Sequence, residues 1–94
     1  GDTGAEEGMV RLFINIGKSQ RIRPGDILGA VAGEAKIPGK LVGAIDMYDN
    51  YTFVEVPSKY ADAVLLAMEN VTIKGRKISM EKAKGTGRKK KKKR

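Results

Sequence analysis

Several residue types on which enzymes and metal sites depend are missing from this chain of 94 residues. It contains no cysteine and no histidine, which excludes disulfides, thiolate or imidazole metal ligands, and nucleophilic mechanisms that need a Cys/His or Ser/His pair. No apolar run approaches the roughly 18 residues of a membrane-spanning helix. The acidic, glycine-rich residues 1–8 differ from a secretory signal peptide. We therefore expect a soluble protein of the cytoplasm.

Motifs for catalysis are also missing. Residues 33–41 contain a Gly-Lys pair, but the spacing after the first glycine is one residue too long, and Leu41 stands where a phosphate-binding loop needs Ser or Thr. Asp46 and Asp49 are too few for a cation site. We expect no catalytic residue, no metal and no cofactor in this chain.

Positive charge is in excess, and the whole of the excess lies at one end. The formal charge is +8, and residues 84–94 hold eight of the nineteen lysines and arginines and none of the eleven acids. The other 83 residues therefore sum to zero. A dense run of like charge with no apolar residue is typical of disorder. We expect an acidic linker at 1–8, one domain at 9–83, and a disordered basic tail at 84–94.

Hydrophobic periodicity predicts six elements in the domain. Alternation predicts strands at 9–16, 41–48 and 51–56, with a tight turn at Asp49-Asn50, and residues 73–81 are expected to supply a turn and the last strand. A helix is expected at 23–33, with Pro24 in its first turn and Gly33 at its end, and a second helix after Ser58 as N-cap. This βαββαβ order predicts an α+β, ferredoxin-like fold, in which both helices cover one face of a four-stranded antiparallel sheet.

The second helix has a stripe of apolar residues at helical spacing, namely Ala61, Val64, Leu65 and Met68. The inward positions of the strands are all aliphatic or methionine: Val10, Leu12, Ile14, Ile16, Ile45, Met47, Val54, Val56, Ile78 and Met80. Together these residues supply a core without any aromatic side chain.

Four of the five aromatic residues fall on the opposite, open face of the sheet: Phe13, Tyr48, Tyr51 and Phe53. They could pair across strands and shield that face. Exposed phenylalanines reduce solubility unless they bind something, and this favours a binding surface. The same face is expected to carry Arg11, Asn15 and Lys77 beside Asp46, Glu55 and Glu81, so its charged residues sum to −1.

Two segments carry a family resemblance. Leu-Phe-Ile-Asn-Ile-Gly at 12–17 and Asp-Asn-Tyr-Thr-Phe-Val-Glu-Val at 49–56 resemble the hexamer and octamer motifs of the RNA recognition motif (RRM). Residues 10–14, 22–30, 42–45 and 73–77 more narrowly resemble the C-terminal RNA-binding domain of bacterial DEAD-box RNA helicases of the DbpA and cold-shock (DeaD/CsdA) type. The Arg-Pro-Gly-Asp-Ile segment at 23–27 is the most specific element, and the likeness covers residues 9–83.

The resemblance implies an RRM-like domain that binds structured RNA, with ribosomal RNA as the expected target, as in ribosome biogenesis. It implies that Phe13, Tyr51 and Phe53 stack on bases, with Tyr48, Arg11 and Asn15 on the same face. ATP hydrolysis, with its ATP and Mg²⁺, would belong to a helicase core upstream in the same polypeptide. The isolated domain is expected to be a monomer. The octamer departs from the family pattern, since Asp49 stands in place of a Lys or Arg and Val56 in place of the last aromatic residue.

Phosphate contacts are expected from the loops. The first loop carries Lys18, Arg21 and Arg23, and the start of the last strand carries Lys74, Arg76 and Lys77. The tail adds Arg88, Lys89, Lys90, Lys91, Lys92, Lys93 and Arg94, which neutralise phosphates without reading sequence.

Two other functions remain open. A domain of the same topology could bind a partner protein through its aromatic face. It could also be an amino-acid-sensing regulatory domain, although the basic first loop, in place of a glycine-rich one, counts against this alternative.

Overall fold

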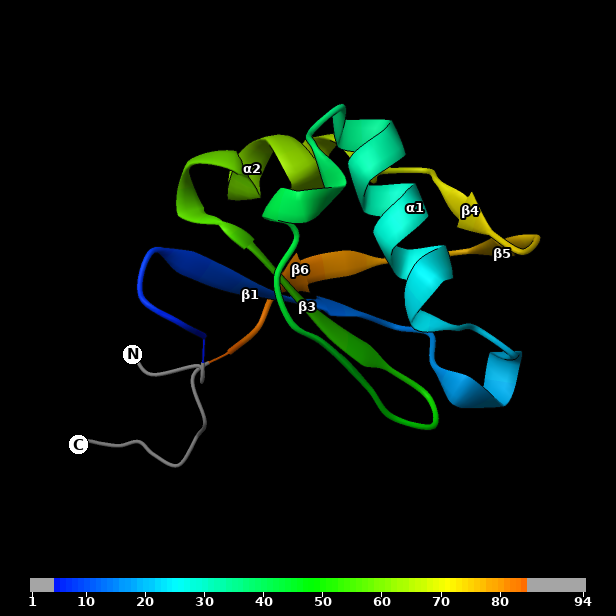
Figure 1. Ribbon diagram of the computed structural model, residues 1–94. Coiled ribbons are helices and arrows are strands. Elements are labelled where there is room, and N and C mark those ends of the chain that lie inside the picture. The colour runs from blue at the N-terminus through cyan, green and yellow to red at the C-terminus, as the bar shows by residue number, and fades with distance from the viewer. Residues whose placement is uncertain (1–4, 85–94) are drawn as a thin grey trace.

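The computed structural model describes residues 5–84, which form a four-stranded antiparallel sheet with two helices on one of its faces (Figure 1). The sheet contains β1 (Met9–Ile14), β2 (Ile45–Met47), β3 (Thr52–Pro57) and β6 (Met80–Lys82), in the spatial order β2-β3-β1-β6. The helices are α1 (Pro24–Ala35) and α2 (Ser58–Ala67). The predicted fold class is therefore confirmed.

Alternation along the strands produces the core between sheet and helices. In the register of β1 and β3, Leu12 faces Val54 and Phe13 faces Phe53, so aliphatic pairs and aromatic pairs lie on opposite faces. The ten residues expected to point inward do so. Six are buried and four are partly buried against the core. Thr52 is also buried there, and its hydroxyl donates to the carbonyl oxygen of Ile16 at 2.7 Å, which removes the cost of burying a polar group.

Helix α1 runs further than its sequence suggests. Gly33 lies inside the helix rather than at its end, and the left-handed residue that terminates α1 is Lys36 (φ 60°). The next residue, Ile37, is buried, and its N–H donates to the carbonyl oxygen of Ala32. Burial of Ile37 therefore sets the end of the helix, and the weak helix propensity of Gly33 does not. Helix α2 begins one residue earlier than predicted. Ser58, the predicted N-cap, is the first helical residue, and Pro57 is the N-cap.

The segment 73–81, expected to supply a turn and the last strand, contains parts of three short strands. Strands β4 (Thr72–Ile73) and β5 (Arg76–Lys77) pair only with each other, around a two-residue turn in which Lys74 (φ 51°) and Gly75 (φ 80°) have positive φ. A turn of this kind favours a tight hairpin. Of these three strands, only β6 joins the main sheet. Lys77 was predicted on the open face, but it lies in the hairpin instead.

Other segments also differ from the predicted bounds. Strand β2 is shorter than the predicted strand 41–48: Leu41 belongs to a 3₁₀ helix, η2 (Gly39–Leu41), and Gly43 and Ala44 both bond to the backbone of Glu55 before the regular pairing begins at Ile45. A second 3₁₀ helix, η1 (Lys18–Gln20), lies between β1 and α1.

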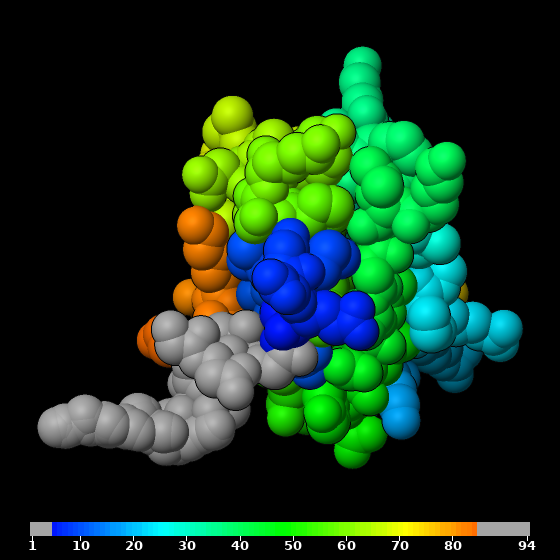
Figure 2. Space-filling model, turned by 60° about the vertical axis from the view of Figure 1, so that its left-hand side comes forward, coloured from blue at the N-terminus to red at the C-terminus, as the bar shows by residue number. Residues whose placement is uncertain are grey.

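Figure 2 shows the first described residues, in blue, packed between green residues and the orange C-terminal part of the described chain. None of the helices within residues 5–84 is long and apolar enough to cross a membrane.

Candidate nucleic-acid interface

Four aromatic rings cluster on the face of the sheet that the helices leave uncovered. Tyr51 stacks on Phe13 and on Tyr48, with ring centroids 5.8 and 4.9 Å apart. Phe53 meets the other three rings edge to face. Tyr48 and Tyr51 are 46% and 38% exposed, whereas Phe13 and Phe53 are half-buried in the cluster. The tyrosines are therefore the most accessible rings, which the strand pattern alone did not indicate.

The two tyrosines are held in place by the loop after β1. The N–H groups of Lys18 and Ser19 donate to the carbonyl oxygens of Tyr48 and Asp49, at 2.9 and 2.8 Å. Such close contact requires glycine at position 17, since a Cβ atom there would collide with the Tyr48 carbonyl oxygen and lie 2.8 Å from the Tyr51 nitrogen. The turn between β2 and β3 is thus fixed against the first loop.

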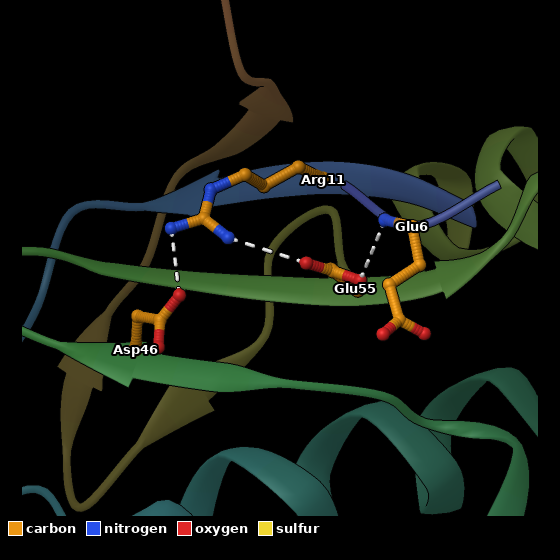
Figure 3. A network of polar contacts seen from close by, with 4 residues as sticks. All are labelled: Glu6, Arg11, Asp46 and Glu55. Atoms are coloured by element: carbon orange, nitrogen blue, oxygen red, sulfur yellow. Dashed lines mark hydrogen bonds and ion pairs between the residues drawn. The ribbon is translucent and has the colours of Figure 1, made fainter. Parts of the chain in front are cut away.

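Arg11 is engaged with neighbours on the same face (Figure 3). Its guanidinium donates to Asp46 at 2.7 Å and to Glu55 at 3.3 Å, and it lies 4.5 Å from the centre of the Phe53 ring. The Arg11 side chain is only 14% exposed. This residue, predicted to contact RNA, therefore covers part of Phe53 and pairs with two carboxylates.

Glu55 is buried, although it points away from the core. Besides Arg11, its carboxylate accepts a hydrogen bond from the backbone N–H of Glu6 at 3.4 Å. The chain turns just after this point, where the Met9 N–H donates to the Glu6 carbonyl oxygen. Residues 5–8 thus lie over the end of the sheet face that is furthest from Tyr48 and Tyr51, and they leave the aromatic cluster at the other end uncovered.

Asn15, also placed on the stacking face by the sequence, contacts the chain before β6. The side-chain oxygen of Asn15 accepts a hydrogen bond from the backbone N–H of Ser79 at 2.8 Å, and the backbone N–H of Asn15 donates to the carbonyl oxygen of Ser79. With Lys77 removed to the hairpin, the charged residues of the face are Arg11 against Asp46, Glu55 and Glu81. The expected sum of −1 is therefore corrected to −2.

A groove of about 310 Å³ opens beside the aromatic cluster. It is lined by Phe13, Phe53, Glu81, Lys82, Ala83 and Lys84. The chain after β6 stays beside β1, because the Ala83 N–H donates to the Arg11 carbonyl oxygen. Sequence reasoning missed Lys82 and Lys84 as lining residues, and the only signal for them was their position just after the last expected strand.

A second concentration of charge lies at an edge of the molecule, around the hairpin turn of β4 and β5. The Lys74 ammonium donates to the Arg21 carbonyl oxygen at 3.1 Å and pairs with Asp26 at 3.3 Å. This contact brings the hairpin turn to the loop before α1, where Lys18, Arg21 and Arg23 are exposed. Arg76 and Lys77 of β5 are exposed as well. We refer to Lys18, Arg21, Arg23, Lys74, Arg76 and Lys77 as the basic edge.

Asp26 ties this edge to α1. Its carboxylate accepts the N–H of Arg23 at 2.9 Å, and this bond is the main cause that lowers the pKa of Asp26 below its ordinary value of 3.8. Partial burial acts in the opposite direction, and the Lys74 ammonium lowers the pKa further. Asp26 is therefore a carboxylate at neutral pH and holds both Arg23 and Lys74 in place.

The part of the chain that the structure describes contains no group of three or more acidic, cysteine or histidine side chains suited to a metal ion. The predicted phosphate contacts Arg88, Lys89, Lys90, Lys91, Lys92, Lys93 and Arg94 lie outside the described residues.

Comparison with known proteins identifies the family. Residues 11–82 match the family model of the DbpA RNA binding domain. The ATP-dependent RNA helicases DbpA of Bacillus subtilis and of Escherichia coli are 32% identical to this chain over 75 and 71 residues, which are 80% and 76% of it. The ATP-dependent RNA helicase DeaD of Haemophilus influenzae is 28% identical over 71% of the chain. The chain spans only 16% of each DbpA helicase and 11% of DeaD. By the extent of these matches, it belongs to the DbpA RNA-binding domain family.

Proposed function

We propose that this domain binds RNA and tethers a DEAD-box RNA helicase to a structured RNA, with ribosomal RNA as the expected target. The observation that carries the proposal is the exposed aromatic cluster on the sheet face, in a chain whose residues 11–82 match the DbpA RNA binding domain. Sequence-specific proteins read RNA mainly in single-stranded loops and bulges, where bases are free to stack on aromatic rings. The cluster offers such a surface.

Stacking and charge attraction are divided between two regions. Tyr48, Tyr51 and Phe13 provide ring surface, at about 1–3 kcal/mol per stacked base. The sheet face is itself acidic, with one cation against three carboxylates, so it does not attract phosphates. The basic edge and residues 88–94 supply that attraction. RNA with a stem and a loop fits this division, because the stem phosphates can follow the basic residues while loop bases reach the sheet.

The tether is suggested by the relatives. DbpA and DeaD are ATP-dependent RNA helicases, and this chain matches a small part of each. We place ATP binding, Mg²⁺ and hydrolysis in a helicase core of the same polypeptide and give this domain no catalytic role. Its setting would be the cytoplasm, in ribosome biogenesis or the cold-shock response.

A titration of the 94-residue chain tests RNA binding directly. Fluorescence anisotropy would measure the affinity of the chain for three labelled RNAs, each at 50 and 200 mM salt. The three RNAs are a hairpin that has a single-stranded loop, an unstructured single strand, and a blunt duplex. We expect the hairpin to bind most tightly and every affinity to fall with salt. Heparin serves as a control polyanion.

If the hairpin binds no better than the duplex or heparin, the chain is only a polycation and the proposal fails. If no RNA binds at either salt concentration, the aromatic face is available for a protein partner instead.

A further inference from the structure

The groove beside the aromatic cluster combines the surface of aromatic rings with the carboxylate of Glu81. In the pairing of β1 and β6, Glu81 is directly opposite Phe13, and both line the groove with Phe53. Its volume of about 310 Å³ is at the lower end of the range for small-ligand sites. The groove can therefore hold one flat group against Phe13 with an edge toward Glu81.

Glu81 differs from the other carboxylates of the face in its contacts. Asp46 and Glu55 both accept from Arg11. Within residues 5–84, no salt bridge or side-chain hydrogen bond involves Glu81, and the residue is exposed. An ionised carboxylate accepts hydrogen bonds through both oxygens and donates none. Glu81 is thus an acceptor that a ligand in the groove can use.

The chemistry of the bases decides which of them fits such an acceptor. Guanine presents two neighbouring donors, N1–H and N2–H, on its Watson–Crick edge, so it can pair with both oxygens of one carboxylate. Adenine, cytosine and uracil each place an acceptor next to their donor on this edge. That acceptor would face a carboxylate oxygen, which disfavours these bases.

We propose that this groove selects an unpaired guanine, whose base lies against Phe13 and whose Watson–Crick edge donates to Glu81. The inference rests on the proposed RNA binding and adds the base that the sheet reads. The guanine must be in a loop, bulge or end, because its pairing edge has to be free.

One lysine of the groove completes a nucleotide site. Lys82 lies opposite Leu12 in the register and its ammonium pairs with Asp62 on α2 at 3.2 Å, so its side chain lies on the helix side of the sheet and leaves the groove to Lys84. Lys84 is exposed and lines the same groove. Its ammonium can meet the phosphate of the bound nucleotide, which offsets the negative charge that Glu81 brings.

The test uses the full chain and RNA hairpins that differ at one position. The loop is uridine except for one central base, which is guanine, inosine, adenine, cytosine or uracil, and anisotropy gives each Kd. We expect guanine to bind about tenfold more tightly than adenine, cytosine or uracil. Inosine, which keeps N1–H but lacks the amino group, should fall between.

The variant Glu81→Gln should lose this preference while still binding the hairpins, because an amide offers only one acceptor. Glu34→Gln is the matched control: it removes the same charge from an exposed position on α1, on the other side of the sheet, and should keep the guanine preference. Thermal denaturation of both variants checks that each is folded.

Equal binding of all five hairpins by the unmodified chain would overturn the guanine inference and leave RNA binding intact. A preference that survives Glu81→Gln would overturn it as well, since the selection would then come from another residue. Failure to bind any hairpin would instead contradict the proposed function.

Discussion

At the scale of single residues, the aromatic side chains divide into accessible rings and supporting rings. Tyr51 is stacked between Phe13 and Tyr48 and remains 38% exposed, whereas Phe53 is half-buried and has the Arg11 guanidinium over its ring. Replacing Phe53 would remove support from the cluster as well as ring surface. Tyr51 is therefore the cleaner position at which to test stacking.

Tyr51→Ala should weaken RNA binding by about 1–3 kcal/mol, because one stacking surface is lost. Its effect on thermal stability should be small, since the side chain is partly exposed. The control is Leu66→Ala, which removes a side chain that is 70% exposed on α2, away from the sheet face, and should leave affinity unchanged. Anisotropy with a hairpin RNA measures both, and equal affinities of the two variants would argue against stacking on Tyr51.

Gly17 is the residue on which the position of the tyrosines depends. Gly17→Ala should destabilise the fold by about 1–3 kcal/mol, because the new methyl group must push away the backbone of the β2–β3 turn. It should also weaken RNA binding by moving Tyr48 and Tyr51.

A glycine with free space around it provides the comparison. Nothing lies within 4 Å of a Cβ atom built at Gly29 in α1, so Gly29→Ala should stabilise the fold by about 0.5–1 kcal/mol. Urea denaturation of both variants gives the two free energies of unfolding. Changes of the same sign in the free energy of unfolding would contradict the close contact at Gly17.

At the scale of elements, α1 and the β4–β5 hairpin are joined through Asp26. Asp26→Asn should lower the melting temperature at neutral pH, because the carboxylate bonds the Arg23 N–H at the start of α1 and pairs with Lys74. The variant should also release the hairpin turn from the loop that carries Arg21 and so disturb the basic edge.

The pH dependence of this effect follows from the lowered pKa of Asp26. A carboxyl whose pKa is lower in the folded state contributes stability that is present above its unfolded value, near 3.8, and is lost as pH falls through the folded value. The difference in melting temperature between the parent chain and Asp26→Asn should therefore be constant near neutrality and shrink below pH 4. A difference that persists unchanged at the lowest pH would show that the charge of Asp26 is not its cause.

At the scale of the whole molecule, charge and ring surface lie in different places. The folded part presents its aromatic cluster on an acidic sheet face and its loop cations at the basic edge, while residues 85–94 contain seven lysines and arginines and no acid. Binding should therefore combine a local, base-dependent contribution with a distributed, salt-dependent one.

Deleting residues 85–94 should weaken binding to every RNA by a similar factor. The slope of log K against log salt should become shallower by about 0.7 for each tail cation that contacts single-stranded phosphate. A tail with the same ten residues in scrambled order should bind as the parent chain does. Loss of affinity for one RNA sequence alone would indicate that the tail reads bases, contrary to this prediction.

The fold could be predicted from the sequence because its signals are local and repeated. Alternation in 9–16 and 51–56 placed Phe13 and Phe53 on the same face of the sheet, and the register of β1 and β3 brings them directly opposite each other. The bounds that failed depend on distant contacts. Helix α1 passes Gly33 because Ile37 is buried one turn later. The last strand of the main sheet is short, because β4 and β5 pair with each other and only β6 pairs with β1.

The sequence by itself determined which residue types face the core and which face outward, since a period of two along a strand leaves no other arrangement. It also determined that the net charge lies in the tail, residues 84–94. Only the tertiary structure decided what the outward residues contact. It engaged Arg11 with Asp46 and Glu55, brought Lys74 to Arg21 across 53 positions of the chain, and placed Glu81 opposite Phe13. These contacts join segments far apart in the sequence, and no local pattern encodes such distances.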